Sequence, residues 1–263
     1  MKRIAQISIV LLLILAVVAA SGCTTGPKSR KLVEEGYLTI GTEAFFPPFE
    51  IRKADDSFYG FDIALGEALA KELGLQAKFV DTDFASIIAS LNAGKFDIAM
   101  SAMTITEERK KSINFSDSYF KSELCLAVPT GSSITSVDEL LNGKIIAVQL
   151  GTTSDFYVTD DLDVAEQYIK RYAHAPDAFL DMKNGNVDAV INDYPVSKPI
   201  VDNEPQSYKI VQTQLTEEDY GIAVPKDNPE LLQKINAALK KLRDDGTYDK
   251  IYDEYIINWN PDN

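Results

Sequence analysis

From residue 37 onward, the apolar positions of the chain alternate between two spacings. Residues 37–44 (YLTIGTEA) form a short apolar run typical of a strand, whereas residues 60–74 (GFDIALGEALAKELG) place their apolar side chains on one face of a helix. Residues 78–83 (KFVDTD), 84–94 (FASIIASLNAG) and 95–103 (KFDIAMSAM) repeat the order strand, helix, strand. This pattern predicts βαβ units, and therefore parallel sheets with helices packed on their faces.

A weak internal repeat divides the chain. Residues 84–102 (FASIIASLNAGKFDIAMSA) and 177–195 (DAFLDMKNGNVDAVINDYP) both run from a helix through Gly and Asp to an apolar strand, at a separation of 91 residues for both the Gly and the Asp. Two similar α/β units are therefore expected. Ligands of open α/β sheets bind outside the carboxyl ends of the strands. The residues at those ends are Ser101, Ala102, Met103, Thr104, Asn192 and Asp193.

Segments near and beyond the second unit complete the expected organisation. Residues 229–256 predict two helices separated at Gly246, and the similar stretches 123–129 (ELCLAVP) and 219–225 (DYGIAVP) are expected to pair as strands that cross between two lobes. The predicted parts are lobe 1 at 32–122 and 224–263, lobe 2 at 123–223, and crossings near 121–128 and 219–225.

The N-terminal residues have the pattern of a secretory signal. Two cations precede a long apolar run and the small residues before Cys23, which predicts a signal peptide at 1–22 and a tether at 23–31. The ending SGC resembles a lipobox whose Cys23 becomes lipidated, although Ala20 stands where Leu is usual. Ordinary signal cleavage and a retained anchor are the alternatives. No later stretch is long and apolar enough to span a bilayer.

Composition excludes several function classes. The chain has 26 Lys and Arg against 40 Asp and Glu, a net charge of −14, which argues against binding nucleic acid. It has one His and two Cys, without the spacing of a zinc site, and we expect no metal or cofactor. Cys125 is expected to be a buried apolar residue, and His174 and Trp259 to be structural.

Residues 101–115 (SAMTITEERKKSINF) contain the most informative charges. Thr106 is a candidate N-cap, after which Glu107 and Glu108 complement the helix dipole. Arg109 opposes the dipole unless an anion faces it. That anion is either a surface acid (Glu107, Glu108 or Asp117) or a ligand carboxylate bound by the guanidinium fork with help from Thr104. Lys110 and Lys111 are expected to be solvated.

Asp193, at the matching strand end of the second unit, would meet an ammonium group. One cation and one anion across a cleft are what a zwitterionic α-amino acid requires.

Six stretches in order along the chain carry a family resemblance. Together they resemble the family 3 extracytoplasmic solute-binding proteins, the polar amino-acid receptors of ABC importers, from about Tyr37 to Tyr255. The stretches are GTEAFFPPFE, YGFDIALGEALAKELG, SAMTITEERKKSINFSDSYF, AVQLGTTS, INDYP and LRDDGTYDKIYDEY. The resemblance implies a type II periplasmic-binding-protein-like α/β fold, whose two lobes are joined by two crossing strands and close on a ligand in the cleft between them.

The resemblance also implies roles for single residues. Arg109 would bind the α-carboxylate and Asp193 the α-ammonium, while the other residues around the two ends of the amino acid would be Ala102, Met103, Thr104, Thr152 and Thr153. Ala102 can offer only its backbone.

The resemblance implies that four residues form the end of the pocket that receives the ligand side chain: Glu43, Phe46, Phe84 and Gln149. Many relatives have Asp where this chain has Glu43. An anion between aromatic faces suits a cationic or amide side chain. Arginine or another basic amino acid is the first expectation, then glutamine, then other polar amino acids. Phe46 and Phe84 could instead be plain core residues, and Glu43 a surface acid.

Two further function classes compete with the binding protein. A cyclohexadienyl dehydratase also resembles these receptors; Glu43 would be its only candidate acid, and Asp193 would repel a dicarboxylate substrate. A sensor domain that acts through a separate partner is the other alternative. The sequence therefore predicts a monomeric extracytoplasmic receptor, not an enzyme, that binds an L-amino acid, is anchored by lipid and delivers to ABC permease subunits.

Overall fold

The structure is a computed structural model that describes residues 30–260 of the 263-residue chain. The chain divides into Met1–Arg30 and Lys31–Asn263, and all that follows concerns the second unit. The predicted signal peptide, Cys23 and most of the tether lie outside the described residues, so those predictions stay predictions.

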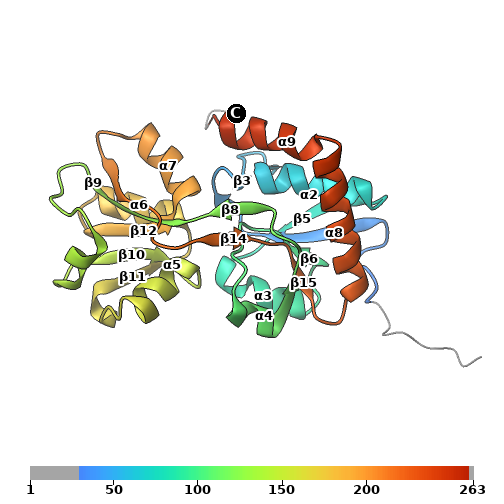
Figure 1. Cartoon of the computed structure of the whole chain (residues 1–263), viewed down its shortest axis with the longest axis horizontal. Helices are drawn as coiled ribbons and strands as arrows, with labels where there is room; N and C mark the ends of the chain where they lie inside the picture. The colour runs from blue at the N-terminus through green and yellow to red at the C-terminus, as the bar shows by residue number, and fades with distance from the viewer. Residues whose placement is uncertain (1–29, 261–263) are drawn as a thin grey trace, which may run out of the picture. The chain divides into compact units, whose positions relative to one another are not determined.

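The first of two five-stranded sheets has the order β5-β1-β6-β15-β7. Figure 1 labels its strands β5, β6 and β15. Strand β1 runs parallel to β5 and β6, whereas β15 runs antiparallel to β6 and β7. The strands are β1 (Tyr37–Thr42), β5 (Gln76–Asp81), β6 (Ile98–Ala99), β7 (Ile113–Phe115) and β15 (Ala223–Pro225).

The second sheet repeats this arrangement, with the order β11-β10-β12-β9-β13. Here β10 is parallel to β11 and β12, and β9 is antiparallel to β12 and β13. The strands are β9 (Leu124–Pro129), β10 (Ile146–Gln149), β11 (Ile169–Tyr172), β12 (Ala189–Asp193) and β13 (Tyr208–Gln212). The internal repeat is thereby confirmed.

The repeated aspartates, Asp97 and Asp188, accept equivalent backbone hydrogen bonds in the two sheets. A carboxylate oxygen of Asp97 accepts a hydrogen bond from the backbone N–H of Thr39 at 2.9 Å, and one of Asp188 accepts from the N–H of Ile145 at 2.8 Å. Each aspartate therefore ties the start of one parallel strand to the start of the next.

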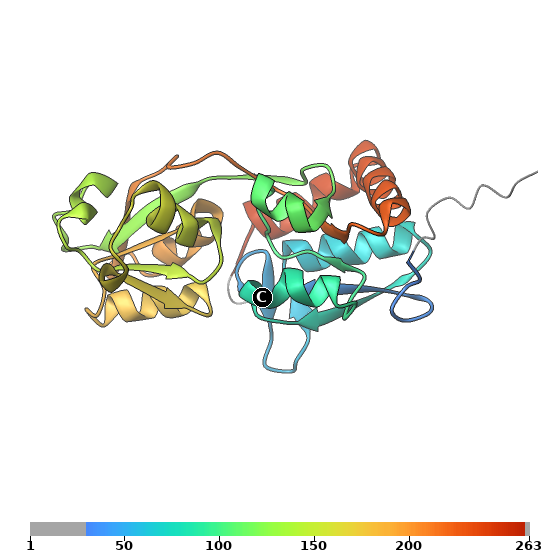
Figure 2. The ribbon, with the colours of Figure 1, turned by 90° about the horizontal axis from the view of Figure 1, so that it is seen from below.

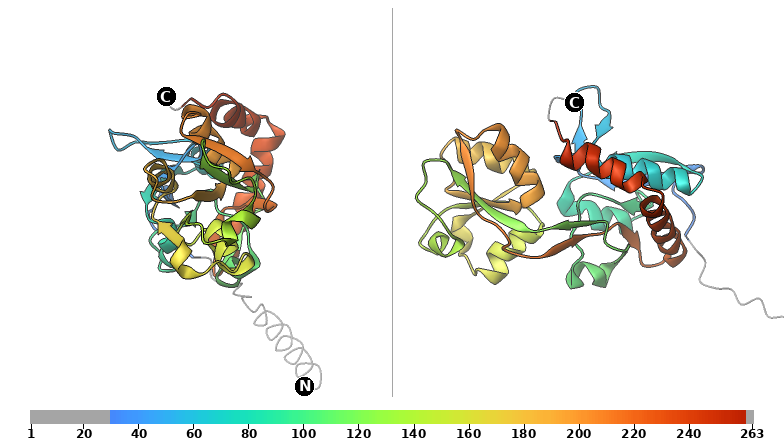
Figure 3. Two further views of the ribbon diagram at one scale, coloured as in Figure 1. Left: turned by 90° about the vertical axis from the view of Figure 1, so that its left-hand side faces the viewer. Right: turned by 45° about the horizontal axis from the view of Figure 1, so that its top comes forward.

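Helices cover both faces of the first sheet. One face packs on α2 (Phe61–Glu72) and α8 (Pro229–Asp244), with α9 (Thr247–Tyr252) beside α2, and the other face packs on α3 (Phe84–Asn92) (Figure 3). The short helix α4 (Glu107–Ser112) leads into β7, and a helical turn at Asp253–Ile257 continues α9. The two predicted C-terminal helices are confirmed, with Gly246 between them at φ 76°.

The second sheet is also covered on both faces. Leu124, Leu126 and Val128 of β9 pack in one core with Val158, and Ala127, between them, packs in the opposite core. The first core adjoins α5 (Thr153–Phe156) and the turn Tyr157–Asp161, and the second lies under α6 (Ala175–Lys183) and α7 (Tyr194–Asn203). The predicted two-lobed α/β fold is therefore confirmed.

Short elements complete the description. A three-stranded sheet is formed by β2 (Phe45–Phe46), β3 (Glu50–Arg52) and β4 (Phe58–Tyr59), and 3-10 turns lie at Val137–Leu141 and Glu166–Tyr168. Cys125 is buried and unpaired, as expected. Among the described residues, no helix combines the length and apolar character needed to cross a membrane.

Two strands cross between the lobes and pair with each other: β8 (Phe120–Ser122) and β14 (Glu218–Tyr220) form an antiparallel ribbon (Figure 2). The predicted crossing is confirmed in part: residues 219 and 220 cross and pair, but with 121 and 120 and not with 123–129. The apolar parts of these stretches, β9 and β15, lie in different sheets, because their fully buried side chains need cover on both faces. The more polar residues just before them make the crossing.

We expect Gly60→Ala to destabilise the protein by about 2 to 4 kcal/mol. Gly60 has φ 131°, and a Cβ there would lie 2.2 Å from the carbonyl oxygen of Phe49. That carbonyl also accepts the N–H of Asp62 at the start of α2, at 2.9 Å. Urea denaturation measures the loss. The control Gly74→Ala, at φ 72° in open space, should cost about 1 kcal/mol, and equal losses would show that the clash is relieved.

Candidate ligand-binding site

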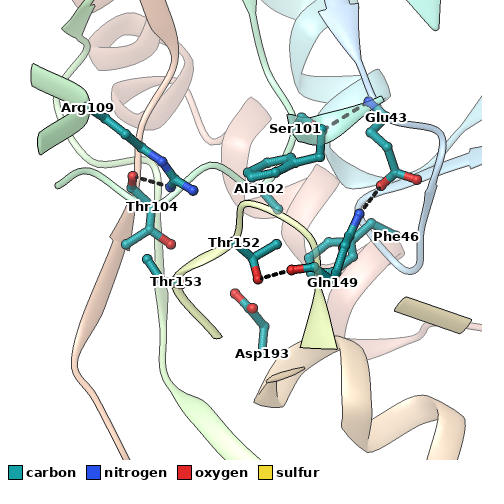
Figure 4. Close-up of a pocket in the computed structure, with 11 residues that line it drawn as sticks. Glu43, Phe46, Ser101, Ala102, Thr104, Arg109, Gln149, Thr152, Thr153 and Asp193 are labelled. Atoms are coloured by element: carbon teal, nitrogen blue, oxygen red, sulfur yellow. Dashed lines mark hydrogen bonds between the residues drawn. The ribbon is translucent and has the colours of Figure 1, made fainter. Parts of the chain in front are cut away.

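A polar cavity lies where the carboxyl ends of strands from both sheets meet (Figure 4). Glu43 follows β1, Ala102 follows β6, Gln149 ends β10 and Asp193 ends β12. Its lining is Glu43, Phe46, Phe84, Ser101, Ala102, Thr104, Arg109, Gln149, Thr152, Thr153 and Asp193. Ten of the eleven predicted ligand-binding residues are therefore brought together from both lobes, as expected for an α/β ligand site.

The cavity is narrow with the lobes in this arrangement. Its volume is about 10 Å³, close to what one water molecule needs. Interlobe hydrogen bonds of Arg109 and Gln149 draw its walls together. An amino acid can therefore enter only if the lobes move apart.

Arg109 is a buried cation at the start of α4. Thr106 caps this helix, as predicted, since its hydroxyl accepts the N–H of Arg109 at 3.1 Å. The guanidinium donates from Nη1 to the carbonyl of Thr104 at 2.7 Å and from Nη2 to the carbonyl of Gly151, in the other lobe, at 3.1 Å. Its plane also lies over the Phe84 ring, at 5.2 Å from the ring centre. Two of the five guanidinium N–H groups are thus used by these bonds.

The surface-pair alternative for Arg109 is wrong. Its side chain is 7% exposed, and Glu107 and Glu108 pair with Lys110 and Lys111 instead. Burial lowers the pKa of Arg109 to about 10, while the negative charges of Glu218 and Asp193 oppose that shift. Arg109 is therefore charged at neutral pH. The acids that favour its charged form, Glu218 and Asp193, lie far from it in the sequence.

Asp193 is a buried acid that shares its surroundings with a second acid. Its carboxylate accepts from the hydroxyl of Tyr220, and Ser122 lies at 3.5 Å. Burial first, and then the charge of Glu218, raise the pKa of Asp193 to about 8, against the lowering effects of Tyr220 and Arg109. A cation arriving beside Asp193 would oppose both causes of the rise.

Glu43 is bound from the opposite lobe on both of its oxygens. Nδ1 of His174 lies 2.6 Å from Oε1, and Nε2 of Gln149 donates to Oε2 at 3.3 Å. Burial raises the pKa of Glu43, although both of these hydrogen bonds lower it. Since Glu43 is 1% exposed, the surface-acid alternative is wrong.

The aromatic predictions divide. Phe46 belongs to the core of the first lobe and also lines the cavity, so both interpretations of it hold. Phe84 is half-buried and contributes its face to Arg109. Met103, by contrast, does not line this cavity: its side chain is fully buried against Ile87 in the core under α3.

The turn after β10 supplies hydroxyl groups from the second lobe. Thr152 caps α5 by accepting the N–H of Asp155, and its hydroxyl donates to the carbonyl of Gln149 at 2.7 Å. Thr153 lines the cavity as the first residue of α5. The turn carries Gly151, whose carbonyl binds Arg109.

Four residues of the site were missed or misread. Ser101 lies at a strand end that the repeat had indicated, so a signal existed. Glu218 and Tyr220 lie on β14, where no local pattern distinguishes them. His174, expected to be structural, contacts Glu43 across the lobes, and Phe45 packs on its ring at 4.3 Å between ring centres. In the described part of the chain, no group of side chains has the composition of a metal site.

These features define a two-lobed α/β binding protein with a charged interlobe site. Residues 38–258 match the bacterial extracellular solute-binding proteins, family 3, and the chain belongs to that family.

Relatives of known function are similar over most of their length. The L-arginine-binding protein of Pseudomonas aeruginosa is 35% identical over 229 residues, which cover 83% of this chain and 87% of that protein. An ancestral arginine-binding protein, solved with arginine and with glutamine, is 44% identical with a TM-score of 0.78, over 84% of this chain and 98% of its own. The ancestral amino acid-binding protein AncCDT-1, a precursor of cyclohexadienyl dehydratase, is 39% identical with a TM-score of 0.77, over 84% and 95%.

We expect Asp193→Asn to flatten the pH dependence of stability. The folded-state pKa of Asp193, about 8, lies above its ordinary value of 3.8, so the folded protein keeps a proton that the unfolded chain has lost. Stability should therefore fall as pH rises from about 4 to about 8, by at most about 1.4 kcal/mol per pH unit for this group. Asparagine does not titrate, so the unfolding free energy of the variant should fall less than that of the wild type between pH 5 and pH 8.

Urea denaturation of ligand-free protein between pH 5 and pH 9 measures this difference. The exposed Asp202, paired with Lys198, gives the control variant Asp202→Asn, which should follow the wild type. Parallel curves for the wild type and Asp193→Asn would contradict the assignment of a bound proton to Asp193.

Proposed function

We propose that this protein is an extracytoplasmic receptor that captures a basic L-amino acid, arginine first, and delivers it to an ABC import permease. The observation that carries the proposal is that Arg109 from one lobe and Asp193 from the other line the same buried cavity. The family supports the receptor role, and the similarity to arginine-binding proteins supports the ligand.

The charges suit the two ends of an amino acid. The ligand carboxylate would take N–H groups of the Arg109 fork, with hydroxyl groups of Thr152 and Thr153 and the backbone near Ala102 and Thr104 as further donors. The ammonium group would lie by Asp193, near Glu218. Because Asp193 is held protonated by burial and by Glu218, an ammonium would restore its charge and gain a charge-assisted hydrogen bond.

The side-chain end favours a cation. Glu43 is a fully buried acid beside Phe46, and a guanidinium is less strongly hydrated than an ammonium and stacks well on an aromatic face. Entry of arginine would replace the contacts that Glu43 makes with His174 and Gln149 in the narrow cavity. The weaker hydration of a guanidinium and its stacking on Phe46 favour arginine over lysine.

Glutamine is the second candidate, favoured by one observation. Gln149 and His174 already satisfy both oxygens of Glu43, so a neutral amide could bind without adding charge. The ancestral arginine-binding protein has been solved with each ligand. Arginine stays the first choice because burial of Glu43 is best compensated by a full positive charge.

Capture would proceed by hinge motion of the lobes. We take 32–122 with 224–263 as one lobe and 123–223 as the other, with bending in the β8 and β14 ribbon. Closure without ligand forms the contacts Arg109 to Gly151, Glu43 to Gln149 and Glu43 to His174, and arginine would take the place of the two contacts that Glu43 makes. The last two involve a side chain that also faces the ligand, so closure and ligand choice are coupled.

A dehydratase is less well supported on this site. Glu43 has a raised pKa and could act as an acid, but a dicarboxylate would bring its second carboxylate toward Asp193 and the charge of Glu218, which would repel it. The same acids suit an ammonium group. We therefore infer binding rather than catalysis, and a receptor of an importer rather than a sensor domain, because the family supports import.

We also propose that the protein is secreted through a signal peptide at 1–22, anchored to the membrane by lipid on Cys23, and monomeric. The sequence pattern before Cys23 supports the anchor. Mass spectrometry of protein extracted from membranes would identify the lipid, and an unmodified N-terminal segment would contradict it.

Arg109→Ala should weaken amino-acid binding strongly. Removing one partner of a buried charge pair costs about 2 to 5 kcal/mol, or roughly 30-fold to several thousand-fold in affinity. Isothermal titration with arginine measures the loss. The neighbouring Lys110→Ala removes an exposed cation of the same helix and should leave affinity within about twofold. Comparable losses in both variants would point to helix disruption instead.

Glu43→Gln should change the preference among ligands. Arginine affinity should fall by at least about 30-fold, since the buried anion is lost, whereas glutamine affinity should change by less than about tenfold. Competitive titration of both ligands gives the ratio. Glu204→Gln, a surface acid paired with Lys183, is the control and should leave the ratio unchanged. An unchanged ratio in Glu43→Gln would favour glutamine as the ligand.

A further inference from the structure

Two carboxyl groups lie together in the core behind the ligand cavity. Glu50 of β3 and Asp62 of α2 are 0% and 1% exposed. Each uses one oxygen in hydrogen bonds to other groups, while Oε2 of Glu50 and Oδ1 of Asp62 are buried without a partner. Neither acid belongs to the cavity lining, and neither is explained by the proposed ligand contacts.

A shared proton accounts for both unpaired oxygens. Each carboxyl group shifts the pKa of the other through a side-chain hydrogen bond, and two carboxyl groups can form such a bond only if one of them carries a proton. Buried unpaired acceptors are costly, and two neighbouring carboxylates in a buried site cannot both ionise readily. One O–H group between the two acids satisfies both oxygens and leaves the pair with one negative charge.

The surroundings favour retention of this proton. Burial, and then the charges of Asp62 and Glu43, hold the pKa of Glu50 well above its usual range. Burial raises the pKa of Asp62 to about 7, against the lowering effects of hydrogen bonds from Ala102 and Tyr119. Tyr248 is the other titratable group that faces Asp62. The main causes of the two shifts include no Lys or Arg.

The outer oxygens of the pair hold the floor of the cavity. Oε1 of Glu50 accepts the hydroxyl of Ser101 at 2.9 Å, and that hydroxyl in turn accepts the backbone N–H of Glu43 at 3.0 Å. Oδ2 of Asp62 accepts the N–H of Ala102 at 2.8 Å and the hydroxyl of Tyr119 at 2.8 Å. Ala102 has φ 44°, in the left-handed region that alanine disfavours, so this backbone needs external support.

We propose that Glu50 and Asp62 share one proton at neutral pH and act as positioning residues that fix Ser101, Ala102 and the backbone of Glu43 in the ligand cavity. The first half of this proposal concerns the folded protein alone. The second half rests on the proposed function, because it links the pair to amino-acid affinity.

Two substitutions of Glu50 distinguish a role of its hydrogen bonds from a role of side-chain packing alone. Glu50→Gln keeps an oxygen that accepts from Ser101 and supplies an N–H donor to Asp62, so it imitates the protonated acid. Glu50→Ala removes both. Arginine affinity at pH 7 should therefore stay within about threefold of wild type in Glu50→Gln and fall by at least about tenfold in Glu50→Ala. Equal losses in the two variants would overturn the positioning role.

Two measurements without ligand test the proton directly. The infrared difference spectrum at pH 7, wild type minus Glu50→Gln, should contain a carboxylic-acid C=O band, and the same band should appear when both proteins also carry Asp193→Asn, which removes the other protonated acid. The folding equilibrium of the wild type should also weaken relative to that of Glu50→Gln as pH rises above the ordinary carboxyl range, by up to about tenfold per pH unit, because the folded state alone retains this proton.

These outcomes remain informative if Glu50→Ala fails to fold or if the ligand is not an amino acid. Identical infrared spectra in the carboxylic-acid region, together with parallel pH profiles, would overturn the shared proton. A wild type that binds no amino acid but shows the band would reject the proposed function while the proton assignment stands.

Discussion

The burial of the Arg109 guanidinium is the constraint on which the rest of the site depends. A buried cation needs negative charge nearby, and the acids that favour its charged form are Glu218 on a crossing strand and then Asp193 at the end of a second-lobe strand. Asp193 holds a proton at neutral pH in the ligand-free protein, so it supplies its charge only when a cation binds beside it. The guanidinium also reaches the carbonyl of Gly151 in the second lobe. One side chain therefore links the helix start, the hinge ribbon and the opposite lobe, and a ligand carboxylate would join the same network.

The acids at and directly behind the ligand cavity form three groups with different roles. Glu218 and Asp193 form the first group, which acts electrostatically on Arg109. Glu43 faces the end of the cavity that would receive the ligand side chain. Glu50 and Asp62 hold the cavity floor through hydrogen bonds to Ser101 and Ala102. Burial raises the pKa of Asp193, Glu43, Glu50 and Asp62, so the cleft and its floor are less negative than their formal charges. A cationic ligand would compensate charge at two of these groups, which explains why an acidic cleft suits a basic amino acid.

Local patterns predicted much of the fold. The period of apolar residues and the repeat of Gly and Asp indicated two matching α/β units, because each Asp closes the same strand junction. The cap at Thr106 was also local, since it depends on residues three positions apart. The crossing strands were misplaced because the apolar stretches beside them gave the stronger strand signal, although burial draws those stretches into the sheets.

The site was predicted less evenly. Residues within recognisable motifs were brought to the cavity, with Met103 as the exception, because its neighbour Ala102 turns through a left-handed conformation and Met103 points into the core. Glu218 and His174 could not be found from local sequence. Their partners, Arg109 and Glu43, lie more than a hundred residues away in the chain, and only the folded lobes bring them together.

The central claim is that Arg109 and Asp193 bind the two ends of a basic amino acid. Isothermal titration of wild-type protein, unfolded and refolded to strip bound ligand, against arginine, lysine, histidine, glutamine and glutamate tests it most directly. We expect tight binding of arginine, weaker binding of glutamine and no binding of glutamate. Binding of none of the five amino acids would contradict the claim.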